Sequence, residues 1–115
     1  DSGMKVVEKP WGREIWIAHT EHYALKIIEF RAGSRSSLQY HRQKHEHIYV
    51  DQGQLRAELE QPDGTLAVQD LGPGSVIENP PGRKHRVQAL VDVRLIEVST
   101  PQLEDVVRVA DDYGR

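Results

Sequence analysis

Four side chains of this sequence have the types and spacing needed to hold a metal ion. Gln39 and His41 stand two residues apart, Glu46 follows a short polar loop, and His85 lies far along the chain. Side chains alternate across a strand with a period of two, so Gln39 and His41 point the same way. Two imidazoles, a carboxylate and an amide oxygen suit zinc, manganese, iron, cobalt or nickel. Taken alone, His41 and His85 would more often be structural or surface histidines.

The same stretch offers a rival set of donors. His45 and His47 also form an H-x-H pair, and Asp51 follows four residues later. If the apolar residues at even spacing after Glu46 face the interior, Glu46 faces inward with them, and both histidines turn outward. Strand parity therefore favours solvent-facing or supporting roles for His45 and His47.

Short alternating segments typical of strands surround these residues. Glycine and proline separate the segments, as in the hairpin turn expected at Gln61–Thr65. Only the tail, from Gln102 to Ala110, has a pattern open to a helix. Many short strands with such turns predict an all-β sandwich or barrel. The expected strands are residues 13–18, 23–30, 47–52, 54–60, 65–70, 75–78, 85–90 and 93–99.

Length and composition narrow the class of protein. A chain of 115 residues has the size of one domain, which we place at residues 4–115, with residues 1–3 an expression remnant before Met4. A net charge of −3 lacks the basic excess of a nucleic-acid binder. No apolar run is long enough for a membrane span, and the absence of cysteine excludes disulfides and thiolate ligands. The expected compartment is the cytoplasm.

Two stretches resemble the motifs of the cupin family. Residues 33–53, GSRSSLQYHRQKHEHIYVDQG, are similar to the first motif, with glutamine in place of its first histidine. Residues 74–85, GSVIENPPGRKH, are similar to the second motif. The resemblance implies a double-stranded β-helix, the jelly-roll barrel of the cupins, in a single domain. It also assigns the metal ligands as Gln39, His41, Glu46 and His85.

A narrower resemblance rests on the stretches EKPWGRE, SLQYH, PPGRKHR, LIEV and EDVVRVADDYGR in this order. They resemble the cupin domain of type II mannose-6-phosphate isomerases, often the C-terminal part of a fused mannose-1-phosphate guanylyltransferase. The likeness runs from Val6 to Arg115. It implies a metal-dependent aldose–ketose isomerase of a sugar phosphate, working through a cis-enediolate, with zinc as the expected ion. The Gly-rich nucleotide-binding half is absent from this sequence, so guanylyl transfer is not expected.

Such chemistry needs a base and cationic groups beside the metal. Lys44 stands where relatives usually carry an arginine thought to act on the substrate, and lysine keeps the charge without the bidentate fork. Lys26 lies on a strand face from which it either reaches the barrel interior or snorkels to solvent. Glu97 is either a buried acid or base or an exposed strand residue. Arg108, in the family-like tail, is expected to close over a phosphate.

Two other functions fit parts of the pattern. One is a stand-alone metal-binding cupin that binds or senses a saccharide without turnover. The other is an iron oxygenase that uses two histidines and a carboxylate, against which the amide of Gln39 counts because it fills a position such enzymes leave open. The expected partner is a small sugar or sugar phosphate. We also expect a homodimer, since dimers are common in the family and Trp11–Ala18 offers an apolar pairing edge.

Overall fold

A computed structural model describes residues 4–115, and this part of the chain forms eleven β-strands and no helix. It therefore contains no helix with the length and hydropathy of a membrane span. The strands, in chain order, are β1 (Lys5–Lys9), β2 (Gly12–His19), β3 (Ala24–Phe30), β4 (Leu38–Tyr40), β5 (Glu46–Gln52), β6 (Leu55–Glu60), β7 (Leu66–Leu71), β8 (Val76–Asn79), β9 (His85–Ala89), β10 (Val93–Ser99) and β11 (Val107–Ala110).

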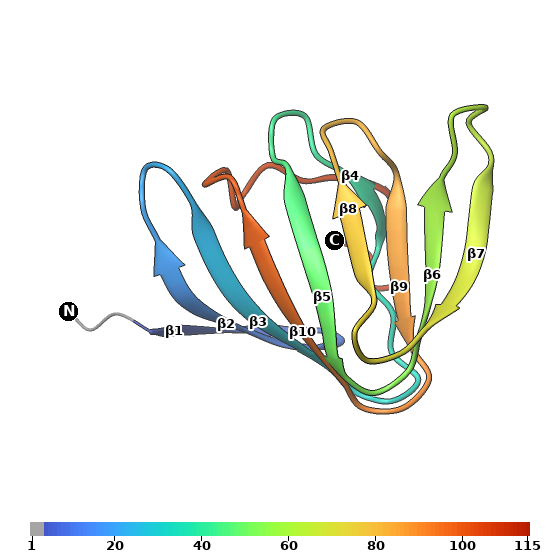
Figure 1. Cartoon of the computed structure of the whole chain (residues 1–115), viewed down its shortest axis with the longest axis horizontal. Coiled ribbons are helices and arrows are strands. Elements are labelled where there is room, and N and C mark those ends of the chain that lie inside the picture. The colour runs from blue at the N-terminus through green and yellow to red at the C-terminus, as the bar shows by residue number, and fades with distance from the viewer. Residues whose placement is uncertain (1–3) are drawn as a thin grey trace.

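The strands form two antiparallel sheets that face each other. The six-stranded sheet has the order β1-β2-β3-β10-β5-β8, and the five-stranded sheet has the order β11-β4-β9-β6-β7. Figure 1 shows the sheets converging at one end and opening toward the other. This is the double-sheet barrel of the cupins, which confirms the expected fold class.

Inward-facing side chains change character along the strands. On β10, Val93 and Leu95 are buried and apolar, whereas Glu97 and Ser99 are buried and polar. The neighbouring strand β3 follows the same order, because Glu97 lies opposite Lys26. The converging end therefore holds the hydrophobic core, and the open end holds a polar interior.

The apolar end is closed by close packing around the β1–β2 and β5–β6 connections. Trp11 stacks on Phe30, with ring centroids 4.0 Å apart, so Trp11 packs in the core. Gly53 has a φ of 95°, and a Cβ there would lie 2.4 Å from the carbonyl oxygen of Asp92. Only glycine fits this position, which explains the glycine at the end of the first cupin-like motif.

The eight strands expected from the sequence are confirmed to within one residue at each end, as is the hairpin turn at Gln61–Thr65. The short strands β1, β4 and β11 were missed. The helix that the sequence left open at Gln102–Ala110 does not form, because local turns precede β11, which pairs with β4. The pairing edge expected at Trp11–Ala18 is also wrong. β2 lies between β1 and β3, so β1 is the outer strand of that sheet.

Candidate metal centre

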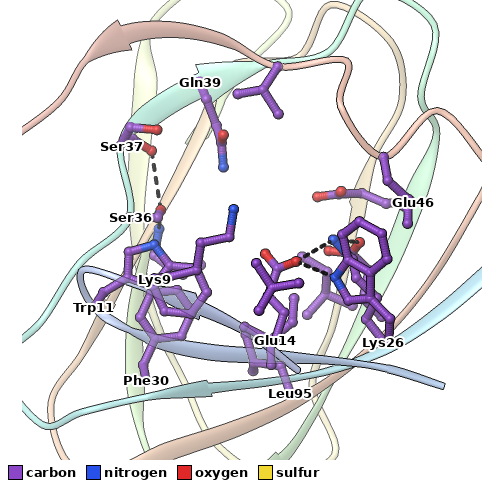
Figure 2. Close-up of a pocket in the computed structure, with 18 of the residues that line it drawn as sticks. Lys9, Trp11, Glu14, Lys26, Phe30, Ser36, Ser37, Gln39, Glu46 and Leu95 are labelled. Carbon is purple, nitrogen blue, oxygen red and sulfur yellow. Dashed lines mark hydrogen bonds and ion pairs between the residues drawn. The ribbon is translucent and has the colours of Figure 1, made fainter. Parts of the chain in front are cut away.

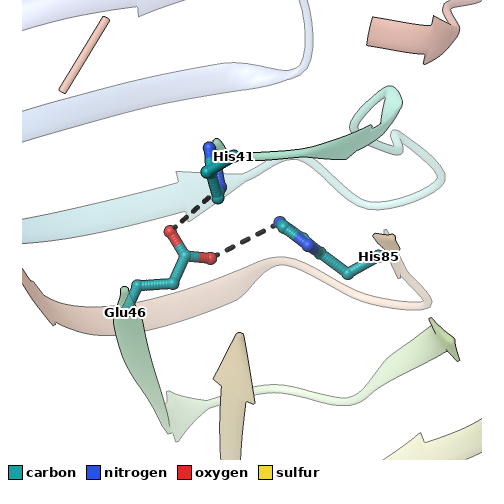
Figure 3. A group of neighbouring side chains, drawn as sticks. All are labelled: His41, Glu46 and His85. Atoms are coloured by element: carbon teal, nitrogen blue, oxygen red, sulfur yellow. Dashed lines mark ion pairs between the residues drawn. The ribbon is translucent and has the colours of Figure 1, made fainter. Parts of the chain in front are cut away.

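Loops and strands far apart in the chain bring His41, Glu46 and His85 together at the open end of the barrel. His41 follows β4, Glu46 begins β5 and His85 begins β9. All three are buried, with at most 4% of their surface exposed. Figure 3 shows each imidazole facing a different oxygen of the Glu46 carboxylate. The inward orientation expected for Glu46 from strand parity is confirmed.

The distances in this group suit a shared ion better than direct hydrogen bonds. Nε2 of His41 lies 3.4 Å from Oε1 of Glu46, and Nε2 of His85 lies 3.5 Å from Oε2. Bonds of 2.0–2.1 Å to a tetrahedral ion would separate neighbouring donor atoms by about 3.4 Å. One donor atom from each of the three residues lies within 4.8 Å of the other two.

Hydrogen bonds to the backbone fix which nitrogen of each ring is free. Nδ1 of His41 lies 2.6 Å from the carbonyl oxygen of Asp105, and Nδ1 of His85 lies 2.9 Å from that of Arg83. A carbonyl only accepts, so each Nδ1 carries the proton and each Nε2 presents its lone pair to Glu46. Nε2 of His41 is buried without a hydrogen-bond partner. A buried unpaired lone pair is costly unless something binds it, so the residues present fit a metal ion.

The charge states of the group also favour ligation. Burial alone would raise the pKa of Glu46, but His41, Lys44 and His85 outweigh it and hold that pKa well below its usual value. Burial lowers the pKa of His85, and the opposing effect of Glu46 is smaller. The carboxylate is therefore ionised and the His85 imidazole is neutral near pH 7, the forms that bind a metal.

Gln39 lies at the same end of the barrel. It is paired with His85 across β4 and β9, and its side chain lines the same cavity, whose volume is about 630 Å³. Figure 2 shows its amide pointing into this cavity. Its role as a fourth ligand stays a prediction.

A chain of buried ion pairs continues from Glu46 into the cavity wall. Nζ of Lys44 donates to Oε1 of Glu46 at 2.9 Å and to Oε2 of Glu97 at 3.0 Å. Nζ of Lys26 lies 3.5 Å from Oε2 of Glu97 and donates to Oε1 of Glu14 at 3.0 Å. Glu97 and Lys26 each expose only 4% of their surface. Glu97 is therefore not an exposed strand residue, and Lys26 does not reach out to solvent.

The pKa values of Glu46 and Glu97, the two carboxylates that share Lys44, are shifted in opposite directions. Burial raises the pKa of Glu97, and the negative charge of Glu46 adds to this effect. Lys44 stays charged, because Glu97 and Glu46 raise its pKa despite burial. Glu46 therefore ionises first, and Glu97 is the carboxyl that can hold a proton. Such a separation is typical of acid–base sites.

Several residues that shape the site were missed from the sequence. Asn79 is fully buried and donates from Nδ2 to Oε2 of Glu46 at 2.9 Å. It alternates with Ile77 on β8, so strand parity would have found it. Lys9 comes from β1, a strand that was not expected, and Figure 2 shows its side chain reaching into the cavity. Arg108, expected from the tail, also lines this cavity.

Asp105 supports the centre through the loop that carries Lys44. Its carboxylate accepts hydrogen bonds from the backbone N–H groups of Arg42, Gln43 and Lys44, at 3.0, 2.7 and 2.9 Å. Burial would raise the pKa of Asp105, but these donors outweigh it and lower the pKa. Its contribution to stability is therefore present above about pH 3.9 and is lost as the pH falls through the lower folded value.

We expect Asp105→Ala to lower the free energy of unfolding of the metal-free protein by about 1–3 kcal/mol, because three backbone donors lose their acceptor. Urea denaturation at pH 7 measures this loss. Glu104→Ala is the matched control, since Glu104 is exposed and its side chain makes no hydrogen bond within residues 4–115. Equal stability of the two variants would contradict the prediction.

Comparison with known proteins adds an independent view of this barrel. Residues 2–111 match the family described as the mannose-6-phosphate isomerase C-terminal domain. The chain is 33% identical over 114 residues to the mannose-1-phosphate guanylyltransferases of Escherichia coli K12 and Salmonella typhimurium LT2. The match covers 95% of this chain but only 23% of each relative.

Solved structures show the same fold at low sequence identity. KdgF from Halomonas sp. superposes with a TM-score of 0.76 at 24% identity, over 88% of this chain and 91% of that one. Oxalate decarboxylase from Bacillus subtilis gives a TM-score of 0.82 at 19% identity, over 94% of this chain and 30% of that one.

Proposed function

Because the chain belongs to the family of mannose-6-phosphate isomerase C-terminal domains, we propose that it is a metal-dependent isomerase. Its substrate would be a sugar phosphate resembling mannose 6-phosphate, interconverted between aldose and ketose through a cis-enediolate. The observation that carries this proposal is the buried centre of His41, Glu46 and His85 in the wall of a large cavity. The guanylyltransferase activity in the names of the two relatives belongs to much longer proteins, of which this chain spans only 23%.

His41, Glu46 and His85 would hold the ion, with Gln39 as the fourth ligand. Two imidazoles and a carboxylate favour zinc, and manganese, cobalt, nickel and iron are the alternatives. Manganese has a precedent in the fold, since oxalate decarboxylase from Bacillus subtilis has Mn(II) centres. When bound, the ion would supply Lewis-acid stabilisation of negative charge on the sugar oxygens.

Glu97 is our candidate for the group that moves the proton between C1 and C2. It is buried beside the centre, lines the cavity and has a raised pKa, which suits a carboxyl that must both accept and return a proton. Lys44 and Lys26 contact it and would hold its side chain in one orientation. Their cationic charge would also oppose the build-up of negative charge in the cavity.

Two cations that line the cavity support a phosphorylated substrate. Lys9 and Arg108 both line the cavity, and neither has an ion-pair partner within residues 4–115. Burial lowers the pKa of Lys9; the charge of Glu14 opposes this effect, and the charges of Lys26, Arg115 and Arg108 add to it. Unpaired cations that repel one another would be relieved by a bound anion.

We expect Lys9→Met to weaken binding of a sugar phosphate by about tenfold or more, the value of one charged hydrogen bond, and to leave binding of the unphosphorylated sugar unchanged. Calorimetric titration of the metal-loaded protein measures both affinities. Lys84→Met is the control, because Lys84 does not line the cavity. Equal losses for both ligands would show that Lys9 does not contact the phosphate.

Proton exchange at C2 tests the isomerase directly. The metal-free protein would be loaded in turn with zinc, manganese, cobalt and nickel, and then incubated with mannose 6-phosphate in deuterium oxide. Proton NMR should show loss of the C2 proton signal and formation of the ketose phosphate, and the EDTA-treated protein should show neither. Absence of exchange with every metal and a panel of hexose phosphates would overturn the proposal. Thermal stabilisation by such ligands without exchange would instead indicate the second function considered, a metal-binding cupin that senses a saccharide.

The family also suggests a homodimer, which stays a prediction. The outer strand β1 is where a second copy could extend the six-stranded sheet, since β2 is covered.

A further inference from the structure

A second group of metal-binding side chains lies on the outer face of the six-stranded sheet. It consists of His45, His47 and Glu78, whose donor atoms lie within 4.8 Å of one another. Glu78 is directly opposite His47 across β8 and β5, and His45 comes just before β5. Asp51, which completed the rival set of donors in the sequence, faces Arg94 instead.

The two imidazoles converge on a single carboxylate oxygen. Nε2 of His45 lies 2.7 Å from Oε2 of Glu78, and Nε2 of His47 lies 3.7 Å from the same atom. The rings are nearly parallel, at 20°, with centroids 5.5 Å apart. The three side chains expose 40–52% of their surface, so they can move to the wider spacing that ligation needs.

Each outer residue is the chain neighbour of a residue in the inner centre. His45 and His47 flank Glu46, and Glu78 precedes Asn79, which donates to Glu46. Alternation along β5 and β8 sends the two sets to opposite faces of one sheet. An ion bound outside would therefore join the same two strands that Glu46 and Asn79 join inside.

We propose that His45, His47 and Glu78 form a second, surface metal site for a borderline divalent ion of the zinc, nickel and copper series. Two imidazoles and one carboxylate select these ions over magnesium and calcium, which prefer oxygen ligands alone. A shallow depression beside the site is lined by His22 and Thr100, which leaves the remaining coordination positions to water or to His22. The site stands independently of the isomerase proposal, because it uses none of the cavity residues.

Zinc titration of the EDTA-treated full chain by calorimetry tests the site. We expect two ions per chain for the wild type, one for His47→Ala, one for His41→Ala and none for the double variant. His19→Ala is the control and should bind two ions, since this exposed histidine lies outside both groups. Side-chain ¹⁵N NMR of His41→Ala should show zinc-induced shifts at the Nε2 atoms of His45 and His47.

Zinc should also raise the melting temperature of His41→Ala and leave that of the double variant unchanged, because binding to the folded state alone stabilises it. Two ions bound by His47→Ala, or unshifted His45 and His47 signals at saturating zinc, would overturn the outer site. A wild type that binds one ion, lost on His47→Ala and kept on His41→Ala, would support the outer site and count against the inner one.

Discussion

Glu46→Gln should remove tight metal binding at the inner centre. Glu46 supplies the single negative charge among the three grouped donors, and its pKa is held well below the usual value, so it is fully ionised near pH 7. Supporting residues that only orient a ligand contribute about 10–100-fold to metal affinity, and loss of a charged ligand should cost at least about 100-fold. Calorimetric titration with zinc in the His47→Ala background measures this site alone.

The fold should survive this change, because glutamine has nearly the same shape and its amide oxygen can still accept from Asn79. Circular dichroism and the urea midpoint report on the fold. Glu58→Gln is the matched control, since Glu58 lies on β6 with its side chain on the outer face. Zinc affinity within threefold of the wild type would show that Glu46 is not a ligand.

Glu97→Gln should lower the rate of C2 proton exchange by about 10²–10⁴-fold while zinc binding remains, as expected when a general base is lost. Glutamine keeps an oxygen that can accept from Lys44 and Lys26, so the cavity wall should keep its shape. The measurement is kcat for exchange of the metal-loaded protein, with the zinc content of each sample determined in parallel. A loss of activity that follows a loss of zinc would instead assign Glu97 to the structure of the centre.

The pH dependence separates the two roles further. The folded protein keeps a proton on Glu97 to a higher pH than the unfolded chain does, because the folded pKa is raised. Stability therefore falls as the pH rises from about 4.3 to that folded value, while the exchange rate rises over the same interval. Glu97→Gln should remove both slopes. Urea denaturation and exchange rates across this range test them.

Much of the barrel could be predicted from the sequence, because its strands alternate regularly and are separated by glycine and proline. Parity on β5 placed Glu46 inside and His45 and His47 outside, which the structure confirms. The two cupin-like motifs placed His85 near His41 and Glu46 although a long stretch of chain separates it from them. The structure adds that the donor atoms of these three residues meet at one point. Their binding of a metal stays a prediction.

The parts that were missed depend on contacts between distant segments. The third member of the outer group is Glu78, because the register of β5 against β8 places it opposite His47. Periodicity within one strand cannot reveal that register. The tail was open to a helix by its local pattern, yet pairing of Val107 with Tyr40 makes it a strand. Tertiary pairing overrides weak local preference in such short segments.

The change from apolar to charged side chains along β10 separates the hydrophobic core from the polar interior within a single strand. Val93 and Leu95 stabilise the fold, whereas Glu97, two positions further on, can be varied without changing the hydrophobic core. New binding specificities can therefore be sought by randomising the polar open end while the hydrophobic core at the converging end is kept unchanged. For protein engineering, a stable scaffold and a variable cavity are combined in one short polypeptide, and the boundary between them falls inside single strands.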